Sequence, residues 1–254
     1  MILAIDVGNT NIVLGLIEDG TIHNIFRFHT TAQETDTEYA VKFSQLLEFQ
    51  HVPLSAIEGS IIASVVPQVT ETLKSALKSL TGKAPLIVGP GMKTGLNVRI
   101  DDPSTLGADL AVGSVAAAEF YGLPAIVIDM GTATTITLVD GERCFRGGAI
   151  VPGVMLSYRA LSSGTSLLTD VSITPSKKVV ATNTADCMRS GAVYGTAAML
   201  DGMIERMEAE FGQKCRIVAT GGLAHCVVPY CKREIICDDD LLLRGLWHLY
   251  QKNV

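Results

Sequence analysis

Residues 2–15 read ILAIDVGNTNIVLG, and this stretch decides the fold. A short apolar run ends in an acid, Asp6, and small or polar residues follow from Gly8 to Asn11. The apolar pattern then resumes and reaches Asp19-Gly20, a dipeptide typical of tight hairpins. The stretch therefore predicts a buried strand that delivers a carboxylate to a glycine turn and folds back as a β-meander.

Residues 123–141, LPAIVIDMGTATTITLVDG, repeat this arrangement. An apolar run again ends in an acid, Asp129, small polar residues again follow it, and an alternating segment reaches Asp140-Gly141. A plain hairpin with an acid at the bend explains a single copy, but two matching copies about half a chain apart favour a shared function. We expect two similar domains in tandem, residues 1–115 and 116–254, each opening with a meander that turns in the same way.

Strand and helix patterns alternate between and after the two copies. Helical spacing occupies residues 36–50, 69–80, 187–212 and 240–253, whereas residues 60–67, 84–89 and 216–222 are typical of strands. Such alternation predicts an α/β fold, with mixed sheets flanked by helices.

Composition excludes several classes of function. The chain has 254 residues, 48% of them hydrophobic, a net charge of −6 and no block of five basic residues, so we expect no nucleic-acid partner. The N-terminal region lacks a basic signal-peptide start, and no apolar run is long enough to cross a membrane. Six cysteines without a C-x-x-C pair are typical of reduced thiols, which indicates a cytoplasmic protein.

The paired acid-glycine loops indicate phosphate chemistry. Small residues let backbone N–H donors approach phosphate oxygens, and the hydroxyls of Thr10 and Thr132 add further donors. A carboxylate repels phosphate, so Asp6 and Asp129 make sense there only with a cation between acid and phosphate. The chain has no G-x-x-x-x-G-K-[ST] sequence, which excludes a P-loop protein.

Two such loops in duplicated domains resemble the actin, Hsp70 and sugar-kinase superfamily, whose domains are actin-like (ribonuclease H-like). Within that superfamily, the ordered motifs resemble type III pantothenate kinases, the CoaX or Baf family. The motifs are DVGNTN at 6–11, GAD at 107–109, DMGTATT at 129–135, GGAIVPG at 147–153, ATGG at 219–222 and GLWHLYQKN at 245–253. Together they span essentially the whole chain.

The resemblance implies ATP-dependent phosphorylation of pantothenate, the first step toward coenzyme A, by a homodimer that needs Mg²⁺ and a monovalent cation, K⁺ or NH₄⁺. It implies that Asp109 is the general base and that Asp129 binds the monovalent cation. Asp6 would meet Mg-ATP, directly or through water. The implied ATP contacts are Asp6, Val7, Gly8, Asn9, Thr10, Asn11, Ile12, Val13 and Thr132. The implied substrate contacts are Ile100, Gly107, Ala108, Asp109, Leu110 and Thr184.

Asp109 has two interpretations on the residues alone. Aspartate is a favoured helix N-cap, and the apolar stretch LAVGSVAAAEF follows it. A carboxylate within hydrogen-bond reach of a hydroxyl can also accept its proton during phosphoryl transfer. The residues leave both roles open, and the resemblance favours the base.

The chain departs from the family pattern at two positions. The family usually has arginine where this chain has Leu110, and tyrosine in the segment where it has Ile100. Replacing arginine removes a fixed cation and a fork of donors. One hypothesis is that another cation replaces it, with Arg99, Arg146 and Arg159 as candidates by proximity in sequence. The alternatives are a pocket that prefers a less acidic or more apolar relative of pantothenate, and a degraded site that leaves an ATP-binding protein with little kinase activity.

Three hypotheses of function therefore remain at this point. The first is a pantothenate kinase, and the second is a kinase for a related small hydroxyl substrate. The third is a nucleotide-binding accessory or regulatory protein with weak or no kinase activity.

Overall fold

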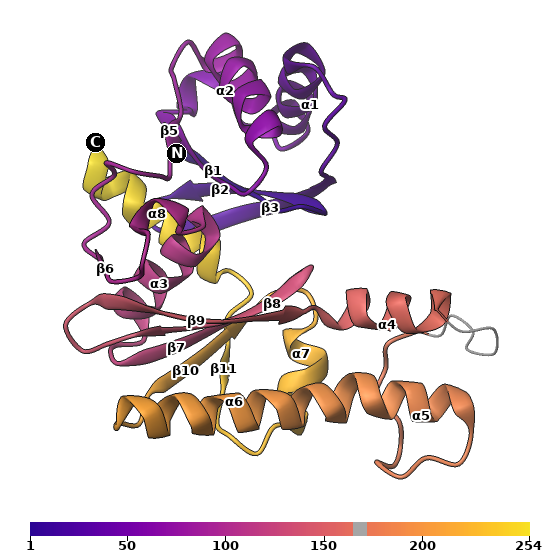
Figure 1. Ribbon diagram of the computed structural model, residues 1–254. Helices are drawn as coiled ribbons and strands as arrows, with labels where there is room; N and C mark the ends of the chain where they lie inside the picture. The colour runs from indigo at the N-terminus through magenta and orange to yellow at the C-terminus, as the bar shows by residue number, and fades with distance from the viewer. Residues whose placement is uncertain (165–171) are drawn as a thin grey trace. The chain divides into compact units, whose positions relative to one another are not determined.

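The computed structural model describes residues 1–164 and 172–254 and has the expected α/β architecture, with two mixed sheets flanked by helices (Figure 1). Its two compact units are not contiguous in sequence. Unit 1 comprises Met1–Gly95, Asp102–Ala116 and Asp240–Val254, and unit 2 comprises Leu96–Asp101 and Ala117–Asp239. One break thus falls beside the expected division at residues 115 and 116, but the C-terminal helix belongs to unit 1. None of the described helices has the length and hydropathy of a transmembrane span.

The sheet of unit 1 has the order β3-β2-β1-β4-β5, with β1 antiparallel to β2 and parallel to β4. Its strands are β1 Ile2–Val7, β2 Asn11–Glu18, β3 Thr21–His29, β4 Gly59–Ser64 and β5 Leu86–Ile87. The helices of unit 1 are α1 Asp36–Phe49, η1 Leu54–Ala56, α2 Pro67–Thr81, η2 Pro103–Thr105 and α8 Leu241–Asn253. Helix α3, Ala108–Phe120, continues from unit 1 into unit 2.

Helices cover both faces of this sheet. Alternate residues of β1, such as Leu3 and Ile5, join a buried core with residues of α1 and α2. Helix α8 packs on the other face, where the Cα of Gly15 faces Leu243 and a Cβ at Gly59 would overlap the Tyr250 ring. Because neither face meets water, β1 reads as a continuous apolar run rather than an alternating one.

The sheet of unit 2 has the order β11-β10-β7-β8-β9-β6. Its strands are β6 Asn97–Val98, β7 Ala125–Met130, β8 Ala133–Val139, β9 Cys144–Pro152, β10 Arg216–Thr220 and β11 Ile236–Cys237. Its helices are α4 Val154–Ser163, α5 Thr184–Ser190, η3 Gly191–Gly195, α6 Thr196–Phe211, α7 Ala224–Val227 and η4 Val228–Tyr230. The helix expected over residues 187–212 is thus α5, a π-helical turn at η3, and α6.

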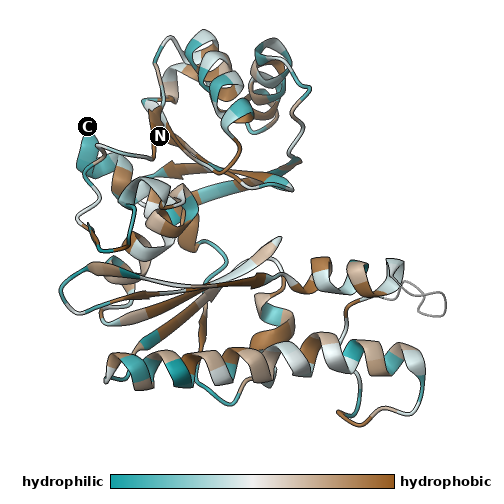
Figure 2. Ribbon diagram, in the orientation of Figure 1, coloured by the Kyte–Doolittle hydropathy of each residue, from teal (hydrophilic) through white to brown (hydrophobic). Residues whose placement is uncertain are grey.

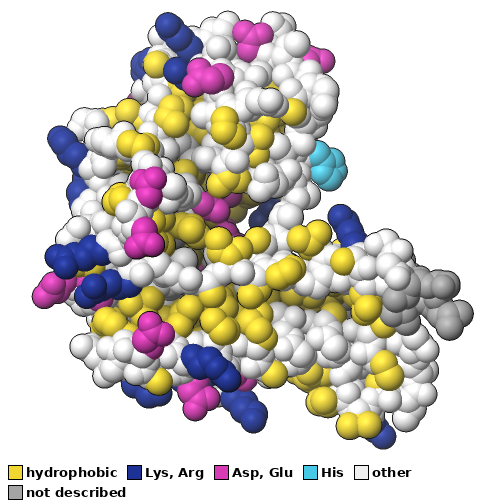
Figure 3. Space-filling model, in the orientation of Figure 1, with side chains coloured by type: hydrophobic (Ala, Val, Ile, Leu, Met, Phe, Trp, Pro, Cys, Tyr) yellow, Lys and Arg dark blue, Asp and Glu magenta, His cyan; other side chains and the backbone are white. Residues whose placement is uncertain are grey.

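The core of unit 2 lies between its sheet and α6. Ala197, Leu200 and Ile204 of α6 are buried in one cluster with Ile126 and Ile128 of β7. Figure 2 shows hydrophobic residues concentrated in the strands and hydrophilic ones interspersed along α6. Some hydrophobic side chains also lie on the visible surface of this unit (Figure 3).

The two meanders turn differently, so the expectation of equal turns was wrong. Asp19 and Gly20 form a two-residue loop with φ values of 49° and 79°, as a type I′ turn requires. The second loop runs from Asp140 to Arg143, and its positive φ of 62° lies at Arg143. The Asp140 carboxylate explains the wider loop, because it accepts the N–H groups of Glu142 and Cys144, both at 2.9 Å.

Candidate active site

Asp6 lies at the carboxyl end of β1, in the middle of its sheet. It is the fifth of six residues, and it pairs with Val13 on β2 and with Ala63 on β4. Its neighbours Val7 and Ile12 are buried, so the strand ends are held firmly. Gly8 and Val13 are partly buried, and Asn9, Thr10 and Asn11 are exposed at the turn. The half-buried carboxylate is therefore followed at once by an accessible loop of small polar residues.

The first loop is closed by hydrogen bonds to the backbone. The Gly8 N–H donates to the Asn11 carbonyl at 2.9 Å. Thr30, the residue directly after β3, donates its N–H to the Thr10 carbonyl at 2.9 Å and its hydroxyl to the Gly8 carbonyl at 2.6 Å. Sequence reasoning missed Thr30, because no motif marks it and its role depends on strand register.

Asp129 occupies the corresponding position in unit 2. It is the fifth of six residues of β7, is half-buried, and pairs with Thr135 on β8 and with Thr220 on β10. Gly131 and Thr132 follow it in an exposed turn. The local geometry expected from the repeat is therefore present in both units.

Two glycines distant in sequence pack against the second loop. A Cβ at Gly153 would overlap the carbonyl oxygens of Gly131 and Thr132. Gly221 has a φ of +97°, and a Cβ there would lie 2.7 Å from backbone atoms of Met130. The GGAIVPG and ATGG motifs thus need glycine because they approach the backbone beside Asp129.

Asp109 lies inside the first turn of α3. The helix begins at Ala108, and the Gly107 carbonyl accepts the Ala111 N–H at 3.0 Å, so Asp109 is its second residue and not its N-cap. Its Oδ1 accepts the neighbouring Leu110 N–H at 2.8 Å. Burial raises the pKa of Asp109, although backbone hydrogen bonds from Leu110 and Asp109 oppose the shift. A carboxylate with a raised pKa is a better proton acceptor than an exposed aspartate.

The other expected substrate residues are divided between the units. Gly107, Ala108 and Leu110 are partly buried in unit 1, together with Asp109. Ile100 and Thr184 belong to unit 2. The Ile100 side chain is partly buried, and its Cγ2 lies beside Gly147 of β9, whereas Thr184 is exposed at the first position of α5.

Of the three candidate substrate cations, Arg146 already has a structural partner. Its Nε donates to Asp140 Oδ2 at 2.8 Å. Burial alone would raise the pKa of Asp140, but the N–H groups of Cys144 and Glu142 and the Arg146 guanidinium together lower it. Arg99 and Arg159 are exposed, so they remain the better candidates for an anionic substrate.

The donors at both loops suit a hard cation that keeps part of its water. Among residues 1–164 and 172–254, no group of three or more His, Cys, Asp or Glu side chains is placed to hold a metal ion. Each loop instead offers a single carboxylate, Asp6 or Asp129, beside backbone oxygens. Mg²⁺ is commonly held by one or two carboxylates with substrate phosphates and water, so Asp6 fits that ion.

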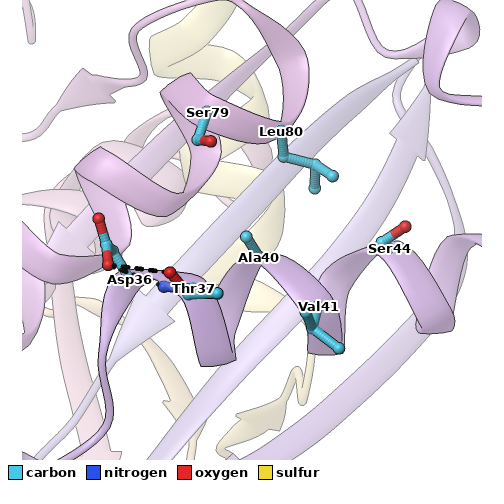
Figure 4. A pocket seen from close by; sticks show the side chains of 7 residues that line it. All are labelled: Asp36, Thr37, Ala40, Val41, Ser44, Ser79 and Leu80. Carbon is cyan, nitrogen blue, oxygen red and sulfur yellow. Dashed lines mark hydrogen bonds between the residues drawn. The ribbon is translucent and has the colours of Figure 1, made fainter.

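A cavity of about 310 Å³ lies elsewhere in unit 1, between α1 and α2 (Figure 4). Its lining contains no cationic side chain and none of the expected site residues. The residues are Asp36, Thr37, Ala40, Val41, Ser44, Ser79 and Leu80. The Asp36 carboxylate there accepts the Thr37 N–H at 2.8 Å. Nothing in this lining suits a nucleotide.

Solved structures with this fold include phosphotransferases. A protein described as a Baf family transcriptional activator from Campylobacter jejuni matches with a TM-score of 0.60 and 21% identity, covering 99% of this chain and 98% of that one. A ROK family glucokinase from Streptomyces griseus matches with a TM-score of 0.52 and 12% identity, covering 97% and 98%. At such identities the likeness shows the fold alone, which is that of actin-like sugar kinases.

Sequence comparison is more specific. The family model for type III pantothenate kinase matches residues 2–206. A curated type III pantothenate kinase from Halalkalibacterium halodurans is 43% identical over 254 residues, all of this chain and all of that protein. The chain therefore belongs to the type III pantothenate kinase family.

Proposed function

We propose that this protein transfers the γ-phosphoryl group of ATP to the terminal hydroxyl of pantothenate, the first step of coenzyme A biosynthesis. The observation that carries the proposal is the match to this family over residues 2–206 and over the full length of a curated relative, and Asp109, partly buried in the first turn of α3, is the base that we propose. Family membership supplies the substrate, and the geometry of Asp109 supplies a base suited to a hydroxyl.

In the proposed reaction Asp109 accepts the hydroxyl proton as the new oxygen–phosphorus bond forms. The bond between the γ-phosphorus and the bridging oxygen breaks, and ADP leaves with that electron pair. The Leu110 N–H donates to Asp109 Oδ1, and this hydrogen bond orients the carboxylate in the first turn of α3.

Loop residues 8–11 would bind ATP phosphates through backbone N–H groups and the Thr10 hydroxyl. Mg²⁺, when bound, neutralises phosphate charge, and Asp6 would hold it, directly or through water. In unit 2, Thr132 would contact ATP, and Asp129 would bind the monovalent cation, K⁺ or NH₄⁺.

Leu110 and Ile100 stand where the family usually has arginine and tyrosine, so the substrate carboxylate needs another partner. We propose that Arg99 or Arg159 supplies the missing cation, because both are exposed and Arg146 is engaged by Asp140. Titration of pantothenate at fixed ATP tests this proposal. The wild-type rate should saturate at ordinary pantothenate levels, and Arg99→Ala or Arg159→Ala should lose that saturation. A pocket for a less acidic substrate would instead leave pantothenate far from saturation.

The deciding experiment measures ADP formation in Mg-ATP and K⁺, with and without pantothenate, for the wild type and Asp109→Asn. Pantothenate-dependent turnover that collapses in the variant is the expected result. Turnover only with other alcohols would identify a different kinase, and nucleotide binding without turnover would identify an accessory protein.

We further propose that the protein is a cytoplasmic homodimer. Three apolar side chains on unit 2 favour a partner surface: Ile150 of β9 is 71% exposed, and Leu156 and Leu161 of α4 are 49% and 46% exposed. Light scattering should give twice the chain mass, and Leu156→Glu should shift the protein toward the monomer. The free cysteines suit a reducing compartment.

A further inference from the structure

Thr30 belongs to none of the sequence motifs, yet it holds the first loop by hydrogen bonds from the end of β3. Thr30 makes two hydrogen bonds to it, from its N–H to the Thr10 carbonyl at 2.9 Å and from its hydroxyl to the Gly8 carbonyl at 2.6 Å. Both acceptors are backbone groups within the stretch that follows Asp6. The hydroxyl bond is partly buried and spans 22 residues of sequence, so it joins the end of β3 to the loop.

Unit 2 contains the equivalent contact. The last residue of β3 pairs with the first of β2, His29 with Asn11, and the last residue of β9 pairs with the first of β8, Pro152 with Ala133. Thr30 and Gly153 are therefore the same position in the two copies. The Gly153 N–H donates to the Thr132 carbonyl at 3.0 Å, as the Thr30 N–H donates to Thr10.

The two copies differ in what the side chain at this position does. A Cβ at Gly153 would overlap the loop carbonyls, so only the backbone bond can form in unit 2. In unit 1, the paired residues Val7 and Ile12 enclose a loop that is one residue longer than the loop between Met130 and Thr134. A hydroxyl therefore adds a second anchor only at the first loop.

Anchoring a carbonyl also orients the N–H group on the other side of the same peptide. A trans peptide is planar, and its C=O and N–H point in opposite directions. With the Gly8 and Thr10 carbonyls directed to Thr30, the N–H groups of Asn9 and Asn11 are directed away from it. Asn9 is an exposed residue of the turn, so the peptide anchored at the Gly8 carbonyl presents a donor of the kind that binds phosphate.

We propose that Thr30 is a positioning residue that fixes the first loop for ATP phosphates, an inference that rests on the proposed function. The hydroxyl, in particular, sets the orientation of the peptide between Gly8 and Asn9. Thr30 touches no reacting atom, so its loss weakens ATP binding and leaves the KM for pantothenate unchanged.

The test compares Thr30→Val with Thr30→Ser. Valine keeps the shape and the backbone bond but lacks the hydroxyl, so the KM for Mg-ATP and the Kd of a non-hydrolysable ATP analogue should rise about 3- to 10-fold. Serine keeps the hydroxyl and should restore both values. Thr81→Val is a matched control, because the Thr81 hydroxyl donates to the Leu77 carbonyl at 2.8 Å in the same unit.

Each outcome decides the inference. Thr81→Val should lower the melting temperature without changing either ATP constant, and Thr30→Val should change both. Equal ATP constants in Thr30→Val and the wild type would overturn the inference, as would failure of Thr30→Ser to restore them. If Thr30→Val does not fold, Thr30→Ala replaces it with the same expectation. If the wild type shows no pantothenate-dependent kinase activity, the proposed function is refuted. The Kd of the ATP analogue would still test the role of Thr30.

Discussion

Asp6 and Asp129 occupy the same place in two strands with the same pattern of burial. Each is the half-buried fifth residue of six in a strand whose other five residues are buried. Each strand is antiparallel to the strand that follows it and parallel to a later one. The two units therefore repeat the same strand pairing around one aspartate. Asp6 and Asp129 can be compared as a matched pair.

Asp6→Asn and Asp129→Asn should affect different ligands. Asparagine keeps the size of the side chain but removes the charge that attracts a cation. In Asp6→Asn we expect the KM for Mg-ATP to rise by about 10- to 100-fold. In Asp129→Asn we expect the rate to lose its response to KCl, measured at constant ionic strength. Each variant serves as the control for the other, and identical changes in both would contradict the separate roles.

Asp109→Asn should slow turnover strongly without destabilising the protein. Asparagine still accepts the Leu110 N–H, but it cannot take a proton, so kcat should fall by about 10²- to 10⁴-fold. Because burial disfavours the charged form of Asp109, removing the charge should leave the melting temperature equal or higher. Steady-state kinetics and thermal unfolding of the same preparation check both statements.

Asp36→Asn is the matched control for Asp109→Asn. Asp36 also lies in the first turn of a helix and accepts the next N–H at 2.8 Å, but it is exposed on α1. It should leave kcat unchanged. The rate of the wild type should also decline at acid pH with an apparent pKa above the ordinary aspartate value, because burial raises the pKa of Asp109. If kcat fell as far in Asp36→Asn as in Asp109→Asn, the assignment of Asp109 as the base would be wrong.

Gly221→Ala should destabilise unit 2 through contact with the backbone of Met130. Gly212 provides the control, since its φ is also positive, +79° against +97°, but a Cβ there meets nothing within 4 Å. Gly212→Ala should cost about 1 kcal/mol, whereas Gly221→Ala should cost at least about 2 to 3 kcal/mol more. Urea unfolding of both variants measures the difference, and equal losses would show that the positive φ alone accounts for the effect.

Much of this architecture could be predicted because its signals are local. The meanders follow from apolar runs of strand length, and α1, α2 and α8 follow from helical spacing. Periodicity cannot detect β6 or β11, which have two residues each. It also cannot say which sheet α8 covers, because that depends on small residues such as Gly15 that face Leu243 across the fold.

The candidate site divides in the same way. Asp6, Asp109 and Asp129 belong to motifs that can be recognised in the sequence alone. Thr30 cannot be recognised in this way. Its contacts depend on the pairing of β2 with β3 and on the length of the loop between β1 and β2. Gly153 belongs to a motif that the sequence shows, but the reason why it must be glycine is its approach to the carbonyls of the second loop, which only the structure shows.

Glu208 should set the acid limit of stability of unit 2. Its side chain is buried on α6, where it accepts both Arg233 NH groups at 2.8 Å, the Lys214 ammonium at 2.7 Å and the Cys215 N–H at 3.0 Å. The Arg233 hydrogen bonds, with those from Lys214 and Cys215, lower the pKa of Glu208 from 4.5 to about 2, against the effect of burial.

A lowered folded pKa means that this stabilisation is present above pH 4.5 and is lost as pH falls toward 2. The difference corresponds to about 3 kcal/mol, at about 1.4 kcal/mol for each pH unit. Glu208→Gln should therefore lower the free energy of unfolding at pH 7, and its deficit should shrink as acid protonates the wild-type carboxylate. Glu210→Gln, at an exposed position of the same helix, should run parallel to the wild type. Denaturant unfolding between pH 2 and pH 7 checks this, and a constant deficit for Glu208→Gln would show that packing rather than charge accounts for its contribution.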